Sequence, residues 1–523
     1  MKKKHSRIAL AALFLVSSIA LTACSGDKKN ETKTEGNNSE TNISQQEPTD
    51  GGSVVVGIQQ DIDSLDPHKA VAAGTSEILF NIYEGLVKPD QEGNLTDAVA
   101  SKHEISTDGK TYTFTLRDGI KFHDGKLVTV DDIVYSVKRS AGLLDKEDSS
   151  IVVKSALQNI SEVKATDDKT VQVSLKTPDT ELLGYMTFAI IPAGYEKCDT
   201  APIGTGPFKF VSYTAGQNIV VEKNNEYWGK KAYLDKVTFK VVPKAETAMN
   251  ELAAGSIDIY PYLTVDQAAQ LEKQFNIQVG NMNLVQALFL NNAAKPFDNQ
   301  KVREAICYAI DRQAVLDLVA GGKGTIIGSG VFSGFTKYFN EDLVSYYNKD
   351  TQKAKALLAE AGYPNGFEFT ITVPSNYQYH VDTAQILVDQ LSEIGVTAKI
   401  KTVEWAAWLS DTYSAREYEA TVVGLDAKLA GSDLLSRYVS TANNNFINFN
   451  NKEYDEIFAK AVATTNDEEK VTYYKQLQKI LTENAASAYI ADPPLMVALN
   501  KKLGGYTFYP VYVQDMASVY FTK

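Results

Sequence analysis

Cysteine and histidine are scarce in this chain of 523 residues, which holds three cysteines and five histidines. No CxxC pair and no Cys/His spacing typical of a zinc site occurs. The motifs GxSxG and HExxH are also absent, so serine-hydrolase and zinc-protease chemistry have no sequence support. Two carboxylates could still meet in space as in a glycosidase, but no pattern points to such a pair. We therefore expect that the protein is not an enzyme and that it has no cofactor and no metal site.

An excess of basic residues is lacking as well. The formal net charge is −13 at pH 7. An acidic surface of this kind argues against nucleic acid as a partner and against electrostatic adhesion to anionic lipid. Long apolar runs are also missing: the run at 8–23 is shorter than the about 20 residues that a comfortable membrane-spanning helix needs.

That short run has the features of an export signal. Four basic residues precede it, and a polar tract follows it, which is the pattern of a secretory signal peptide. Its end, LTAC, resembles the lipobox of bacterial lipoproteins. The resemblance implies cleavage of 1–23 and lipidation of Cys24, and each buried lipid methylene then contributes about 0.8 kcal/mol to anchoring. An ordinary signal peptide followed by a chance cysteine is the alternative.

Cleavage would leave a mature chain with a formal charge of −17, a polar linker at 24–50 and a body at 51–523. The linker has one isoleucine and no other large apolar residue, so we expect it to be flexible. Only Cys198 and Cys307 would remain in the body. Their interpretation as separate buried thiols is favoured over a disulfide, because free cysteine packs as a small apolar residue.

The body has interleaved strand and helix patterns. Strands are predicted at 53–58, 111–116, 237–242, 367–373 and 396–403, where apolar runs or strict alternation occur. One helix is predicted after Thr129 as its cap, with Asp132 at the capping-box position, and a second after Asp298 as its cap. A third is predicted to start at Thr351 and to end at Gly362. The mixture indicates α/β lobes with mixed sheets.

Four long motifs carry a family resemblance. They are EGLVKPDQEGNLTDAVASKHEISTDGKTYTFTLRDGIKFHDGKLVTVDDIVYSVKR at 84–139, PIGTGPFKFVSYTAGQNIVVEKNNEYWGKKAYLDKVTFKVVP at 202–243, LFLNNAAKPFDNQKVREAICYAIDR at 288–312 and AKALLAEAGYPNGF at 354–367. Their order and content resemble the signatures of family 5 extracellular solute-binding proteins. These proteins include the oligopeptide, dipeptide and nickel receptors of ABC importers.

The resemblance implies a two-lobed fold like that of periplasmic binding proteins, of type II and cluster C. The chain would divide into a first lobe, a subdomain inserted in it, and a second lobe. The expected ranges are 51–92, 200–285 and 496–523 for the first lobe, 93–199 for the subdomain, and 286–495 for the second lobe. Ligand would be held between lobes that close by hinge motion.

The resemblance also implies partners and a location. We expect a monomer tethered by its lipid to the extracellular face of the cytoplasmic membrane, as in a Gram-positive bacterium. It would capture short peptides or single amino acids and deliver them to an ABC permease and its ATPase subunits. A receptor for a metal or metallophore and a sensor of signalling peptides are the alternatives, and neither is excluded.

Several residues are predicted to line the ligand cavity, some of them from the family's pattern. The segment AVAAGT at 70–75, with Ala73 and Gly74, matches the strand along which family receptors hold a peptide backbone, although a surface loop explains it almost as well. The other candidates are Trp405 in an EW pair that matches the family's, Tyr377 and His380 in SNYQYH, and Gln286 beside the expected hinge. Trp405 could equally be a core residue.

One expected contact departs from the family. Family peptide receptors bind the ligand ammonium with an aspartate four residues after a strand-ending glycine. Counted from Gly424, that position holds Lys428, and Asp426 lies two residues earlier on the same face of an extended segment. Asp426 could bind an ammonium and Lys428 a carboxylate. Alternatively, the two side chains form a salt bridge at the cleft rim and neither contacts the ligand.

Overall fold

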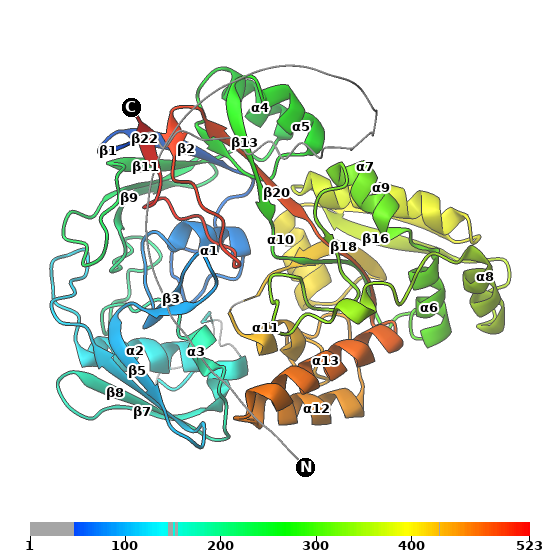
Figure 1. The fold of residues 1–523 in the computed structure, drawn as a ribbon, viewed down its shortest axis with the longest axis horizontal. Coiled ribbons are helices and arrows are strands. Elements are labelled where there is room, and N and C mark those ends of the chain that lie inside the picture. Colours follow the sequence, from blue (N-terminus) through cyan, green and yellow to red (C-terminus); the bar gives the residue numbers. More distant parts are fainter. Residues whose placement is uncertain (1–46, 145–149, 152–154, 428) are drawn as a thin grey trace, which may run out of the picture. The chain divides into compact units, whose positions relative to one another are not determined.

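Three large sheets organise the residues that the computed structural model describes, which are 47–144, 150–151, 155–427 and 429–523 (Figure 1). The sheets have seven, six and four strands, and two small sheets accompany them. The predicted signal peptide, Cys24 and Lys428 lie outside the described residues. Pro48 and Thr49, at the end of the predicted linker, form strand β1 and pair with β22.

The seven-stranded sheet has the order β13-β20-β12-β2-β11-β10-β9. Its strands are β2 (Ser53–Ile58), β9 (Phe208–Thr214), β10 (Asn218–Lys223), β11 (Lys236–Val241), β12 (Ile259–Tyr260), β13 (Phe275–Asn281) and β20 (Pro494–Asn500). Strand β2 pairs in parallel with β11 and β12, and the other pairs are antiparallel. Successive residues of β20 point to opposite faces of the sheet and so enter different cores. Val497 packs with α1 (Ala73–Leu79), whereas Met496 packs with α4 (Ala245–Ala253) and α5 (Val265–Leu271).

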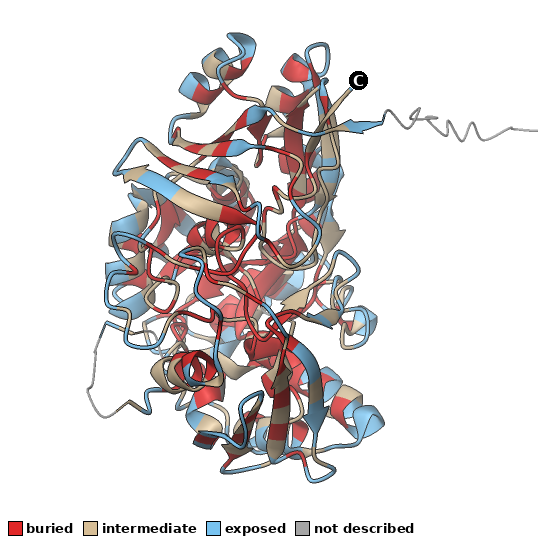
Figure 2. Cartoon of the chain, turned by 90° about the vertical axis from the view of Figure 1, so that its left-hand side faces the viewer, coloured by how far each residue is buried: buried red, intermediate tan, exposed pale blue. Residues whose placement is uncertain are grey.

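The six-stranded sheet has the order β15-β19-β14-β18-β16-β17. Its strands are β14 (Val285–Leu290), β15 (Thr325–Ile326), β16 (Glu368–Pro374), β17 (Thr397–Val403), β18 (Ala420–Leu425) and β19 (Ser487–Asp492). Every residue of β14 is buried, because helices cover both faces. Leu288 packs with α6 to α9, whereas Phe289 packs with α11 to α13. Figure 2 shows buried segments concentrated in the interior of the chain and exposed segments toward its edges.

The helices on the two faces of this sheet have well-defined limits. Those on the Leu288 side are α6 (Gln300–Ala309), α7 (Arg312–Ala320), α8 (Thr351–Glu360) and α9 (Gln378–Ser392). Those on the Phe289 side are α11 (Gly431–Ser436), α12 (Lys452–Ala463) and α13 (Asp467–Glu483). Between β17 and β18 come the short helix α10 (Trp405–Ala407) and a π-helix at Trp408–Ser414.

The four-stranded sheet is antiparallel, with the order β5-β6-β8-β7. Its strands are β5 (Ala100–Ile105), β6 (Thr111–Leu116), β7 (Ile160–Ala165) and β8 (Thr170–Leu175), and helix α2 (Val130–Ala141) packs on them. The remaining elements are β1 (Pro48–Thr49), β3 (Val87–Pro89), β4 (Leu95–Asp97), α3 (Leu182–Tyr185), β21 (Leu503–Gly504), β22 (Tyr520–Thr522) and 3-10 turns at Ser155–Asn159 and Glu341–Leu343.

The chain passes directly from the seven-stranded to the six-stranded sheet between β13 and β14, and back between β19 and β20. The two crossings are joined, because the carboxylate of Asp492 accepts a hydrogen bond from the N–H of Leu284 (3.1 Å). Strands that pass between two sheets in this way are suitable hinges. The predicted lobe boundaries themselves stay a prediction.

Several local predictions are confirmed. Thr129 and Asp132 form the capping box of α2, and Cys198 and Cys307 are buried and unpaired. The predicted cap Asp298 is wrong by one residue: Asn299 caps α6, and its side chain accepts from the N–H of Lys301 (3.0 Å). Asparagine and aspartate cap equally well, so the sequence alone favoured neither position. No helix among the described residues has the length and apolarity needed to cross a membrane.

Candidate functional site

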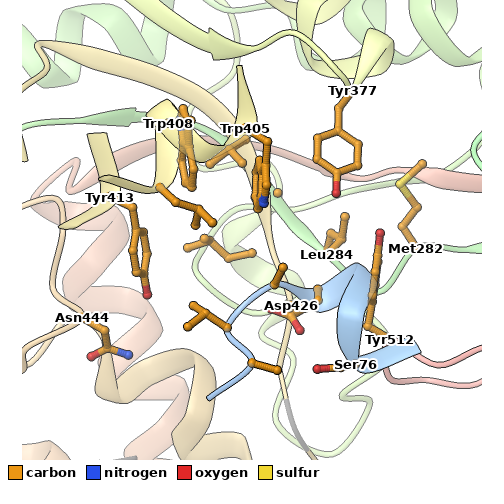
Figure 3. A pocket seen from close by; sticks show the side chains of 18 of the residues that line it. Ser76, Met282, Leu284, Tyr377, Trp405, Trp408, Tyr413, Asp426, Asn444 and Tyr512 are labelled. Carbon is orange, nitrogen blue, oxygen red and sulfur yellow. The ribbon is translucent and has the colours of Figure 1, made fainter. Parts of the chain in front are cut away.

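A cavity of about 330 Å³ lies between segments that belong to the two larger sheets (Figure 3). On the side of the seven-stranded sheet, the lining comes from the loop before α1 and from Tyr262 and Tyr512. On the side of the six-stranded sheet, it comes from the start of α9, from the end of β18 and from α11, and also from Trp405, Trp408, Leu409 and Tyr413. Five of the predicted residues line it, namely Ala73, Tyr377, His380, Trp405 and Asp426.

The loop before α1 forms one wall and is held by a single carboxylate. Asp63 accepts hydrogen bonds from the N–H groups of Val71 (2.7 Å) and Ala72 (3.1 Å). Ala73 lines the cavity, whereas Gly74 is not among the lining residues. A Cβ on Gly74 would come within 2.7 Å of the Gln60 side-chain nitrogen, so a larger residue here would displace the end of that side chain.

His380 links three elements beside the cavity. Its Nε2 accepts the N–H of Gly424 at the end of β18 (3.2 Å), and its Nδ1 lies 2.9 Å from the side-chain amide of Gln286 on β14. Burial lowers the pKa of His380 to about 3, so the ring is neutral. A neutral ring that accepts at Nε2 carries its proton on Nδ1. The side-chain oxygen of Gln286 has no other partner among the described residues. If the amide group is rotated so that its oxygen and nitrogen exchange places, this oxygen accepts a hydrogen bond from the Nδ1–H of His380.

Gln286 was predicted as a ligand contact, but the structure buries it completely and does not place it on the cavity wall. Gln286 lies behind the cavity wall, where its side chain orients the ring of His380. His380 in turn bonds to the backbone N–H of Gly424. Space at Gly424 is limited: an added Cβ would lie 2.8 Å from the Leu284 Cδ1. Glycine is therefore favoured here, because any larger residue would require the side chain of Leu284 at the first crossing to shift.

Aromatic rings form much of the wall. Trp405 stacks on the buried Trp408 with centroids 5.2 Å apart and planes at 10°, and Tyr377 meets Trp405 edge to face at 5.5 Å. The indole N–H of Trp408 donates to Thr421 (3.0 Å). The indole N–H of Trp405 is buried, and no described residue accepts a hydrogen bond from it. Figure 3 shows these rings and Asp426 around one space.

A tyrosine cluster around Glu77 completes the wall on the side of α1. Tyr262 stacks on Tyr512 (5.9 Å, 24°) and meets Tyr377 edge to face (6.5 Å, 80°). Its hydroxyl donates to the carboxylate of Glu77 (2.7 Å). Burial raises the pKa of Glu77 to about 8, and the nearby charge of Asp426 adds to the effect. This end of the cavity thus combines aromatic faces with acidic groups.

Asp426 follows β18 and is half-buried at the cavity wall. Its backbone carbonyl accepts a hydrogen bond from Nη2 of Arg437 (3.0 Å), which also lines the cavity. Because Lys428 lies outside the described residues, both interpretations of the Asp426 and Lys428 pair stay predictions.

A second cavity of about 310 Å³ adjoins the first. The residues that line both are Pro67, Ala70, Ser76, Thr187, Phe188, Asp426 and Tyr512. Asp426 therefore lies where the two cavities meet. Within the described ranges, no group of three histidine, cysteine, aspartate or glutamate residues could hold a metal ion.

Sequence reasoning missed Glu77, Tyr512 and Arg437. Arg437 is the only arginine in the stretch 422–438 in which the ligand ammonium site was sought, so its charge was a usable signal. Glu77 and Tyr512 are brought together by the fold across more than 400 residues, and no local pattern marks either.

Comparisons with known proteins agree with this architecture. The profile described as "Bacterial extracellular solute-binding proteins, family 5 Middle" matches residues 94–446. "Heme-binding protein A" of Haemophilus influenzae is 31% identical over 80% of this chain and 82% of its own. The "Dipeptide-binding protein" of Escherichia coli is 29% identical over 79% of this chain and 84% of its own.

A solved structure extends the match to three dimensions. The ABC transporter-associated periplasmic binding protein DppA from Helicobacter pylori, in complex with the peptide STSA, is 28% identical and superposes with a TM-score of 0.83. The match covers 91% of this chain and 99% of DppA. The expected α/β fold of two-lobed periplasmic binding proteins is thereby confirmed. The chain belongs to the family 5 bacterial extracellular solute-binding proteins.

Proposed function

We propose that this protein is a lipid-anchored receptor of an ABC importer that captures short peptides or single amino acids between two hinged lobes. The closed, loaded receptor would then deliver its ligand to the permease. Lipidation of Cys24 would hold the body near that permease on the extracellular face of the cytoplasmic membrane, and the acidic segment 24–50 would act as a tether.

The single observation that carries the proposal is the composition of the cavity wall. Two adjoining cavities of about 330 and 310 Å³ fall in the range of pockets for small ligands. Their walls join apolar and aromatic surface to a few polar groups, among them the unpartnered N–H of Trp405 and the carboxylate of Asp426. A peptide offers such a wall a carbonyl for the indole donor and an ammonium for the carboxylate.

The geometry of the crossings supports capture by closure. Leu284 lies at one crossing and also lines the cavity, so a rotation at the crossings would change the cavity's opening. A ligand held from both sides would favour the closed state by its extra contacts there.

Native mass spectrometry of protein purified from cells tests the proposal. We expect a bound mass, or a ladder of masses, that fragments as short peptides or single amino acids. The Trp405→Ala variant, purified in parallel, should retain less of this material if the ligand occupies the cavity. A metal adduct as the sole bound species, or a non-peptide organic molecule, would contradict the proposal.

A further inference from the structure

Arg437 is a cation in the cavity wall with an unusual set of partners. Its Nε donates to the backbone carbonyl of Asp433 (3.4 Å), and its Nη2 donates to the backbone carbonyl of Asp426 (3.0 Å). Both partners are neutral carbonyl groups. They fix the plane of the guanidinium. Burial acts to lower the pKa of Arg437, but the charges of Asp433 and Asp426 raise the pKa above its usual value, so the group stays a cation.

No carboxylate among the described residues makes a hydrogen bond to this guanidinium. An oxygen of Asp433 lies 4.0 Å from Nη2, which makes a long ion pair but is beyond hydrogen-bond distance. The side chain of Arg437 is only 10% exposed. A buried charge is costly unless it is paired and hydrogen-bonded. The Asp433 pair leaves this guanidinium without a carboxylate at hydrogen-bond distance, so an anionic group that enters the cavity can bond to it directly.

The donors left over point to the kind of anion. A guanidinium has five N–H groups in a fixed fork, and two of the Arg437 donors are engaged by carbonyls. No described residue accepts from Nη1. Two parallel N–H groups match the two oxygens of a carboxylate. Asn443 and Asn444 also line the cavity.

We propose that Arg437 binds a carboxylate of the ligand and selects for ligands that carry one, whereas Asp426 serves the ammonium. This inference rests on the proposed function, because it assumes that a peptide or amino acid occupies the cavity. The close position of Arg437 and Asp426 gives the wall a cationic and an anionic group side by side. Such a pair suits a compact zwitterionic ligand or a short peptide that folds its ends together.

Two tripeptide mixtures test the proposal on the full body of the protein. Both mixtures lack aspartate and glutamate; one has free carboxyl termini, and the other is identical but amidated. Binding of each to the parent protein is measured by native mass spectrometry and titration calorimetry. A third, amidated mixture that contains glutamate separates a side-chain carboxylate from a terminal one.

Three variants accompany the parent. Arg437→Gln removes the charge, and Lys428→Ala removes the competing cation predicted from the sequence. Arg416→Gln is the matched control, since Arg416 also bonds to neutral groups, Asn448 and Asn443, but does not line the cavity. Thermal unfolding of every variant establishes that it is folded before its binding is compared.

We expect the parent to bind one of the carboxylate-bearing mixtures about ten- to a hundredfold more tightly than its carboxylate-free counterpart. Arg437→Gln should abolish that preference, and Arg416→Gln should keep it. A preference that survives in Arg437→Gln, or disappears only in Lys428→Ala, would overturn the role of Arg437 and leave the proposed function intact. Binding of no mixture to the parent would overturn both.

Discussion

The carboxylate of Glu181 accepts a hydrogen bond of 2.6 Å from the hydroxyl of Tyr474, and both residues are buried. Glu181 precedes α3 and belongs to the range predicted as the inserted subdomain, whereas Tyr474 lies on α13, which packs on the six-stranded sheet. Ser432 donates its N–H to the same oxygen (2.9 Å), and Tyr338 donates to the other (3.2 Å). One acidic side chain thus ties the two sides of the molecule together.

Removing this carboxylate should weaken the contact. We expect Glu181→Ala to lower the free energy of unfolding by about 1–3 kcal/mol, because it leaves buried donors without an acceptor. It should also shift the population toward a more open conformation, which small-angle scattering detects as a larger radius of gyration. The control is Glu162→Ala, which removes an exposed carboxylate paired with Lys164. Equal stability and equal dimensions for both variants would contradict this role for Glu181.

The close approach at Gly424 makes a second prediction. Gly424→Ala should lower the free energy of unfolding by about 1–3 kcal/mol, because its Cβ would lie 2.8 Å from the Cδ1 of Leu284 and 3.4 Å from the ring of His380. The measurement is urea denaturation. The double variant Gly424→Ala with Leu284→Ala should lose less than the two single changes together, since the shorter side chain frees space. Strict additivity would exclude the clash as the cause.

Local structure was accessible from the sequence because its signals are local. The strands predicted at 53–58 and 111–116 coincide with β2 and β6, where apolar runs and alternation follow the pleat. The capping box at Thr129 was found for the same reason, since its two partners are three residues apart. The overall fold could be predicted because the four family motifs indicate a family whose two-lobed architecture is known.

The composition of the cavity was only partly accessible. Trp405 was found because it matches a family position, and Asp426 because it lies beside a position that departs from the family. Glu77 and Tyr512 were not, because their proximity depends on how the C-terminal segment packs against α1. Gln286 was expected on the cavity wall. Because every residue of β14 is buried, the sequence of this strand shows no alternation that would reveal which face meets the cavity.

Glu77 should make stability depend on pH. Its pKa is raised by burial from the usual 4.5 to about 8, so the folded protein holds a proton that the unfolded chain releases. Its stabilising effect is therefore complete below about pH 4.5 and is lost as the pH rises to 8, at up to about 1.4 kcal/mol per pH unit.

Glu77→Gln, which mimics the protonated form, should remove this contribution. Relative to the parent, the variant should gain stability between pH 5 and pH 8, as measured by urea denaturation at each pH. The exposed Glu246 provides the control substitution Glu246→Gln, for which the difference from the parent should be the same at both pH values. A constant difference for Glu77→Gln as well would mean that Glu77 ionises normally.

Anchoring by Cys24 gives a fourth prediction. Cys24→Ser should release the mature body into the medium, because only a lipid on that sulfur is expected to hold it. Fractionation of cells followed by detection of the protein measures the release, and metabolic labelling with a tagged fatty acid measures the lipid directly. Cys198→Ser changes a buried thiol of the body and should leave labelling intact. An equally abundant, uncleaved variant in the membrane fraction would refute the lipobox interpretation.

Asp426 gives the last prediction, since a carboxylate in a partly desolvated wall should bond to a ligand ammonium. Asp426→Asn keeps the shape of the side chain and removes its charge, so peptides with a free amino group should bind about ten- to a hundredfold more weakly. N-acetylated peptides should bind the variant and the parent alike, and calorimetry with both series measures the difference. The exposed Asp411 supplies the control Asp411→Asn. If Asp426→Asn binds free-amino peptides as tightly as the parent, the carboxylate does not contact the ligand, and recognition lies with Trp405 and its aromatic neighbours.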